Sequence, residues 1–191
     1  MHRIIKKSIE EGIMGLNYES LDERTREFML REIEFDIAKG NLYLSKRFNE
    51  NGLDKYLELL KSAAQKQDDN WLGNELRRLG CFKAFIEKKT PSGGSTKIKV
   101  PVNAAETFAE GEFNRFYIRG LCRVAIEDGI LELEICRGKE VSRPRIESEA
   151  RIGKTVPAEK LLEDLRKYPG VEPALGVPSG PNSGLTARLP S

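Results

Sequence analysis

The stretch FNRFYIRGLCR contains three arginines whose spacing suits one face of a helix. Arg115, Arg119 and Arg123 recur every four residues, so a helix here would align them in a row. A guanidinium group donates paired hydrogen bonds to phosphate or carboxylate oxygens, so the row could bind anions. The alternative is that the neighbouring aromatic residues form the core and the arginines a solvated face, with ion pairs to Glu112 and Glu127.

Two further segments concentrate positive charge, although the net charge of the 191-residue chain is only +2. Residues 77–99 hold seven Lys and Arg residues and a single acid, Glu87. Arg143 and Arg145 flank Pro144, which favours extended backbone beside it. The sequence therefore predicts binding of nucleic acid or another anion by a set of basic residues: Lys88, Lys89, Lys97, Arg115, Arg119, Arg123, Arg143 and Arg145.

The segment KKTPSGGSTKIK combines glycines, hydroxyl side chains and lysines, as phosphate-binding loops do. A Walker A loop places Lys directly after its second glycine and opens a helix. Here Lys97 follows Ser95 and Thr96, and strand-like residues come next. We therefore interpret the segment as the tip of a β-hairpin, which either contacts a polyanion or is simply solvated.

Candidate catalytic groups are sparse. Glu132 and Glu134 alternate along a predicted strand and share one face, where carboxylates with Asp128 or Lys139 nearby could hold Mg²⁺. That arrangement would suit a metal-dependent enzyme acting on nucleic acid, which we keep as the alternative function. The one histidine is His2. We predict no catalytic residue, no metal site and no cofactor.

The number and spacing of the cysteines indicate the cellular compartment in which the protein resides. Cys81, Cys122 and Cys136 are odd in number and widely spaced, which fits neither a disulfide framework nor a CxxC metal site. We expect buried, reduced thiols. Hydrophobic residues make up 39% of the chain and charged residues 32%, which is a globular composition. With no signal peptide or membrane span recognised, we expect a cytoplasmic protein, either free or incorporated in a particle.

The elements that position these residues follow from the periodicity of the apolar side chains. Helices are expected at 19–40, 52–67, 68–80, 103–129 and 156–168, hairpin strands at 81–89 and 97–102, and a further strand at 130–136. Ser20 with Glu23, and Asn103 with Glu106, suit capping boxes. These elements predict an α+β fold in one domain, residues 1–168, helical over 1–80 and mixed over 81–168.

The helix at 103–129 is expected to be the central element. Phe116, Tyr117, Leu121 and Val124 should be buried along it. Glycines cost about 1 kcal/mol each against alanine in an exposed helix. Gly111 and Gly120 therefore indicate either a break near Gly111 or another element packed closely against the helix.

Residues 169–191 are rich in proline and glycine, and we predict an extended C-terminal arm. The arm carries six residues able to dock in a groove: Val171, Leu175, Val177, Leu185, Arg188 and Leu189. The groove could belong to a neighbouring subunit or to the same domain. We favour the neighbouring subunit, and hence a non-catalytic structural subunit of a virion-like or nucleoprotein assembly. Its expected partners are protein, including self-assembly, and nucleic acid, but no membrane.

Overall fold

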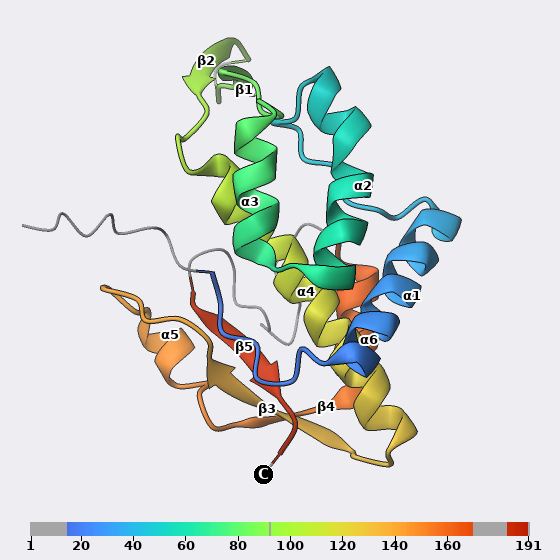
Figure 1. The fold of residues 1–191 in the computed structure, drawn as a ribbon. Coiled ribbons are helices and arrows are strands. Elements are labelled where there is room, and N and C mark those ends of the chain that lie inside the picture. The colour runs from blue at the N-terminus through green and yellow to red at the C-terminus, as the bar shows by residue number, and fades with distance from the viewer. Residues whose placement is uncertain (1–14, 92, 170–182, 191) are drawn as a thin grey trace, which may run out of the picture.

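The computed structural model describes residues 15–91, 93–169 and 183–190, which form an α+β fold (Figure 1). This part of the chain contains six helices and two small sheets, so the predicted fold class is confirmed. The helices are α1 (Glu23–Lys39), α2 (Glu50–Lys66), α3 (Asp69–Arg78), α4 (Ala104–Glu127), α5 (Ile146–Glu149) and α6 (Ala158–Lys167). The strands are β1 (Phe85–Lys89), β2 (Ser95–Lys99), β3 (Glu132–Arg137), β4 (Thr155–Pro157) and β5 (Leu185–Arg188).

The long helix α4 is the centre of the fold, as its aromatic periodicity predicts. It packs against α1, α3 and α6. Phe116, Tyr117 and Leu121 have no exposed surface, and Val124 is 5% exposed. Burial of side chains this large contributes about 1.5–3 kcal/mol each to folding, so the packing around α4 supplies much of the stability of the fold.

The two glycines of α4 have different surroundings. A Cβ atom built on Gly120 would lie 2.8 Å from the backbone oxygen of Thr25, so α1 approaches α4 too closely for a side chain there. Gly111 has nothing within 4 Å of the same position, and α4 runs through it unbroken. The expected close packing occurs at Gly120, and the alternative of a break at Gly111 does not.

The helix caps differ from the two predicted capping boxes. Asp22, not Ser20, caps α1, because its carboxylate accepts a hydrogen bond from the Thr25 amide at 2.8 Å. The Ser20 amide instead donates to the Tyr117 hydroxyl at 3.3 Å. Asn103 precedes α4 without a side-chain capping bond. Neither Ser20 nor Asn103 therefore caps its helix through its side chain.

The three-stranded sheet has the antiparallel order β4-β3-β5. Its outer strand β5 comes from the segment expected to be an arm, with Ala187 opposite Ile135 and Thr186 opposite Cys136. The Asn114 side chain on α4 fixes β5, because it donates to the Leu185 oxygen and accepts from the Thr186 hydroxyl. Leu185–Arg188, which was expected to be part of an extended arm, is thus a strand of this sheet.

The second sheet is the predicted hairpin, β1 antiparallel to β2. It lies at the far end of α3 in Figure 1, away from the three-stranded sheet. Of the described helices, none is long and apolar enough to span a bilayer.

Candidate functional site

The hairpin is bonded to the rest of the fold where its strands begin, and it ends in a short turn. Val100 is buried, and its amide donates to the Ala84 oxygen at 2.9 Å, while Phe48 bridges Phe82 just below. At the tip, the Gly94 amide donates to the Thr90 hydroxyl at 3.0 Å. Gly93 adopts a φ of 84°, which favours glycine. The base of the hairpin is therefore held by the rest of the described fold, called the body below, and the two strands extend from it.

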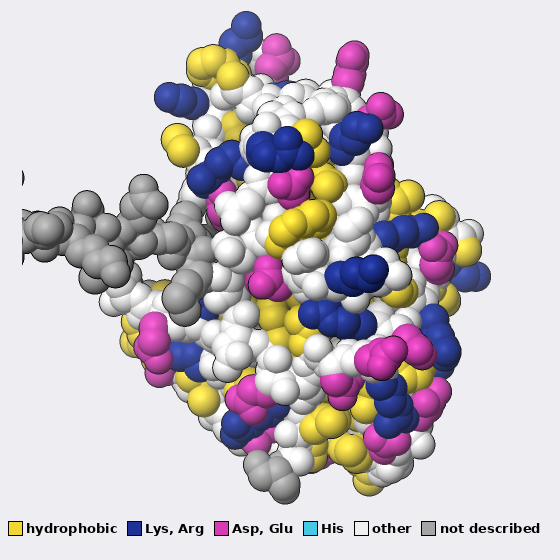
Figure 2. Space-filling view, in the orientation of Figure 1, with side chains coloured by type: hydrophobic (Ala, Val, Ile, Leu, Met, Phe, Trp, Pro, Cys, Tyr) yellow, Lys and Arg dark blue, Asp and Glu magenta, His cyan; other side chains and the backbone are white. Residues whose placement is uncertain are grey.

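Positive charge on this hairpin is largely uncompensated. Lys88, Lys89, Lys97 and Lys99 are all exposed, and none forms an ion pair with a carboxylate in the described part of the chain. The one acid of the hairpin, Glu87, lies opposite Lys97 in the register. Figure 2 shows Lys and Arg side chains beside apolar side chains over this end of the molecule. Lys88, Lys89 and Lys97 are thus accessible, as an anion-binding role requires.

The arginine row of α4 is placed differently. Arg119 has no exposed surface, and its Nη1 donates to Asp36 Oδ2 at 2.6 Å while its Nη2 donates to Glu32 Oε2 at 2.9 Å. Both carboxylates come from α1. The alternative of a solvated arginine face is therefore wrong for Arg119, and its guanidinium group is not accessible to a polyanion.

Arg115 is buried beside it, with 3% of the residue exposed. Its Nη2 lies 3.1 Å from Glu112 Oε2 and 3.8 Å from Asp36 Oδ2. Burial raises the pKa of Glu112, although the charge of Arg115 opposes that shift. Arg123 is half-buried, with its guanidinium carbon 5.5 Å from the Phe28 ring centroid. The row faces α1 rather than forming an open anion-binding stripe.

A third helix completes this buried ionic network. Arg166 of α6 donates to Glu32 Oε1 at 2.5 Å. Burial opposes ionisation of Glu32, but the hydrogen bonds and charges of Arg166 and Arg119 outweigh it and lower the pKa of Glu32. The network therefore joins α1, α4 and α6 and explains why carboxylates and guanidinium groups are tolerated in the core.

The two arginines that flank Pro144 lie far from the hairpin. Arg143 and Arg145 are exposed in the loop before α5, beside the three-stranded sheet, at the opposite end of the molecule in Figure 1. Glu149, which follows them, pairs with Arg137 instead. Hairpin lysines and loop arginines do not form one continuous surface.

The candidate metal ligands are dispersed. Glu134 accepts a hydrogen bond from Arg188 at 2.7 Å, and Asp128 accepts one from Arg24 at the same distance. Lys139 pairs with Glu110 at 3.0 Å, and Glu132 is exposed. Across the described ranges, no group of three or more His, Cys, Asp or Glu side chains is arranged to hold a metal ion. The convergence that a metal-dependent site would need is not found there.

The thiols agree with the prediction of buried, reduced cysteines. Cys81, Cys122 and Cys136 are buried and free. Burial raises the pKa of all three, to about 11 for Cys136. A thiol that stays protonated is a poor nucleophile, so these cysteines have a packing role.

The docking residues of the C-terminal segment fall into two groups. Leu185 is 1% exposed in the core of its own chain, and Leu189 packs partly buried against that core. Arg188 pairs with Glu134 and Glu19. Val171, Leu175 and Val177 lie outside the described residues, so docking on a neighbour stays a prediction for them.

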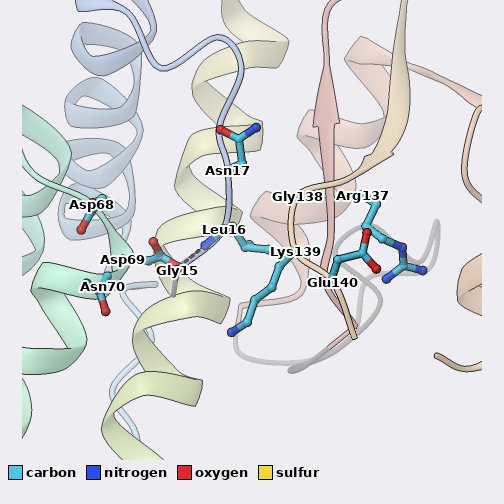
Figure 3. Close-up of a pocket in the computed structure, with 10 residues that line it drawn as sticks. All are labelled: Gly15, Leu16, Asn17, Asp68, Asp69, Asn70, Arg137, Gly138, Lys139 and Glu140. Carbon is cyan, nitrogen blue, oxygen red and sulfur yellow. Dashed lines mark hydrogen bonds between the residues drawn. The ribbon is translucent and has the colours of Figure 1, made fainter. Parts of the chain in front are cut away.

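A pocket of about 740 Å³ lies between residues 15–17, the start of α3 and the segment after β3 (Figure 3). Asp69 lines it, 3% exposed, with its Oδ2 accepting from the Leu16 amide at 3.0 Å. Burial raises the pKa of Asp69 to about 6, and the charge of Glu110 adds to the shift. The pocket's cations, Arg137 and Lys139, both pair with carboxylates of the chain.

The sequence did not reveal this pocket, since Asp68 and Asp69 look like two ordinary residues at a helix start. Asp68 does cap α3, by accepting from the Trp71 amide at 2.8 Å. Asp69 is turned toward Gly15 and Leu16 instead, and holds that distant segment. Because both cations of the pocket are paired with carboxylates of the chain, the hairpin is the stronger candidate site for an anion.

Comparisons with family models, curated proteins and solved structures found no significant match to this chain.

Proposed function

We propose that this chain is a non-catalytic subunit of a nucleoprotein or virion-like assembly, and that it binds nucleic acid through the β1–β2 hairpin. The observation that carries the proposal is the clustering of unpaired positive charge on one hairpin. Lys88, Lys89, Lys97 and Lys99 lie together there, exposed and without ion pairs to carboxylates among the described residues, and Glu87 is the one acid of the two strands.

Exposed ammonium groups suit a phosphate backbone for a physical reason. Each phosphate that a lysine neutralises releases condensed counterions, and this release favours binding at low salt. Such contacts carry no sequence information. A subunit that coats or packages nucleic acid needs affinity of this kind rather than base readout, and the chain's small net charge limits that affinity to one local surface.

The test is binding of fluorescently labelled duplex and single-stranded oligonucleotides at several salt concentrations. The four hairpin lysines are changed together to Gln, and the matched control changes Lys39, Lys55, Lys66 and Lys160 to Gln, which removes the same charge from exposed positions elsewhere. The log–log salt dependence should have a slope of about −0.9 per neutralised phosphate for duplex. The hairpin variant should flatten this slope, and the control should leave it nearly unchanged.

Two results would overturn nucleic-acid binding by the hairpin: no binding by the wild type at low salt, or equal weakening by the two four-lysine variants. The assembly half of the proposal is read from the mass of the full chain in solution. A mass well above the 21.6 kDa of one chain is expected. A purely monomeric protein, with and without oligonucleotide, contradicts it.

A further inference from the structure

The hairpin also carries an aromatic side chain that the body does not cover. Phe85, the first residue of β1, is 54% exposed, and every other aromatic residue in the described ranges is buried or half-buried. Nearby rings are used differently: Phe48 packs on Tyr56, Phe82 and Phe108 with centroids 4.8–5.2 Å apart. Phe85 shares no such ring contact with a described residue.

The strand register places this ring among the lysines. Phe85 is opposite Lys99, and directly opposed residues of an antiparallel pair lie on the same face. Side chains two positions apart along a strand also share a face. Lys89 and Lys97 therefore lie on the face of Phe85, together with Glu87 opposite Lys97. The ring lies at one end of this face, and the ammonium groups lie along it.

We infer that this face binds single-stranded nucleic acid, with an unpaired base stacked on the Phe85 ring and the phosphates contacted by Lys89, Lys97 and Lys99. The inference rests on the proposed function and adds the form of nucleic acid. An exposed aromatic ring next to basic side chains is the combination by which proteins bind single strands. In a duplex the faces of the bases are stacked on one another, so the ring would find no base to stack on.

Glu87 limits where the phosphates lie on this face. Its carboxylate repels phosphate and lies opposite Lys97, so it offsets part of that lysine's charge. Lys99 at the base and Lys89 toward the tip have no acid opposite them, since their partners are Phe85 and Ser95. We therefore expect the strongest phosphate contacts at the two ends of the face, with one of them beside the ring.

The experiment compares three substitutions of Phe85 in the full chain. Phe85→Leu removes the ring but keeps an apolar side chain, Phe85→Tyr keeps the ring, and Phe85→Trp adds a fluorescent ring. Affinity is measured for a poly-dT single strand and a duplex of equal length. Loss of one base stack is expected to weaken single-strand binding by about 5- to 100-fold in Phe85→Leu. Phe85→Tyr should bind as the wild type does.

Two further readouts separate stacking from charge. The salt slope of single-strand binding should not change in Phe85→Leu, because no phosphate contact is lost. In Phe85→Trp, poly-dT should quench fluorescence beyond the change seen in the wild type, whose one tryptophan, Trp71, is half-buried on α3. Duplex affinity should be the same in all four proteins.

The possible failures are distinguishable. If Phe85→Leu changes single-strand affinity less than twofold while the four-lysine variant weakens it, stacking is wrong and the proposed function stands. If Phe85→Leu weakens single-strand and duplex binding equally, the preference for single strands is wrong. If the wild type binds neither oligonucleotide at low salt, the proposed function itself is rejected, and this inference with it.

Discussion

Arg119 of α4 and Lys97 of the hairpin carry the same charge in opposite surroundings. Arg119 has no exposed surface and donates hydrogen bonds to both Glu32 and Asp36. Lys97 is exposed and has only Glu87 opposite it. A buried charge loses its hydration and is stable only when paired, whereas an exposed charge needs no partner. Paired charges thus belong to the buried contacts between helices, whereas the clustered lysines of the hairpin stay available to a partner.

The aromatic residues of the same two regions give the largest expected contrast. Phe116 has no exposed surface in the core around α4, so Phe116→Ala removes a ring and leaves a cavity. We expect the free energy of unfolding to fall by about 3–5 kcal/mol. Phe85→Ala removes the same atoms from a 54% exposed position and should change it by no more than about 0.5 kcal/mol.

Urea denaturation of the two variants beside the wild type measures both values. The affinity for a single-stranded oligonucleotide should show the reverse order: the folded Phe85→Ala protein should lose more affinity than the folded Phe116→Ala protein. A Phe116→Ala protein that unfolds within a degree or two of the wild type would contradict the central role of α4. A Phe85→Ala protein as unstable as Phe116→Ala would show that the hairpin is part of the core.

Buried carboxylates with and without a cation give a second contrast. Arg166 and Arg119 lower the pKa of Glu32 despite its burial, whereas burial raises that of Asp69 from 3.8 to about 6. At a pH between 3.8 and about 6, the folded protein therefore binds more protons at Asp69 than the unfolded chain does. Asp69 therefore stabilises the fold less as the pH rises, by about 2–3 kcal/mol between pH 4 and pH 7.

Asp69→Asn should abolish that loss, because asparagine does not titrate and its carbonyl oxygen still accepts from the Leu16 amide. Unfolding of wild type and variant is measured at several pH values, and the difference between them isolates Asp69 from the carboxylates that both proteins share. The variant is expected to gain relative to the wild type as the pH rises. Parallel profiles would mean that the Asp69 carboxyl is not desolvated.

Features of the fold that depend on local patterns were predictable. The aromatic periodicity of α4 and the alternation in the hairpin both gave the correct elements. The exposure of the hairpin lysines also follows from composition, since a glycine-rich tip flanked by lysines is rarely covered. These features require only residues close together in the chain.

The features that could not be predicted depend on contacts between residues far apart in the sequence. Arg119 pairs with Glu32, 87 positions away, so only local partners such as Glu127 could be proposed for the row. Strand β5 arises among prolines and glycines because β3 and Asn114 offer hydrogen bonds to it. The exposure of Phe85 was equally hidden, because an apolar residue in an alternating strand is normally covered by another element.

The smallest expected effect, and the most closely matched pair, concerns the two glycines of α4. Gly120→Ala places a Cβ 2.8 Å from the Thr25 backbone oxygen, so α1 must move, and we expect a loss of about 1–3 kcal/mol. Gly111→Ala meets nothing within 4 Å, and the lower entropy of the unfolded alanine chain should add about 0.4–1 kcal/mol to the free energy of unfolding.

Both variants carry the same substitution in the same helix, so helix propensity cancels and the difference in stability between them measures the α1–α4 contact. Thermal or urea unfolding shows whether each variant is more or less stable than the wild type. If both variants gain stability, α1 lies farther from α4 than the structure places it, and if both lose stability, an element covers Gly111.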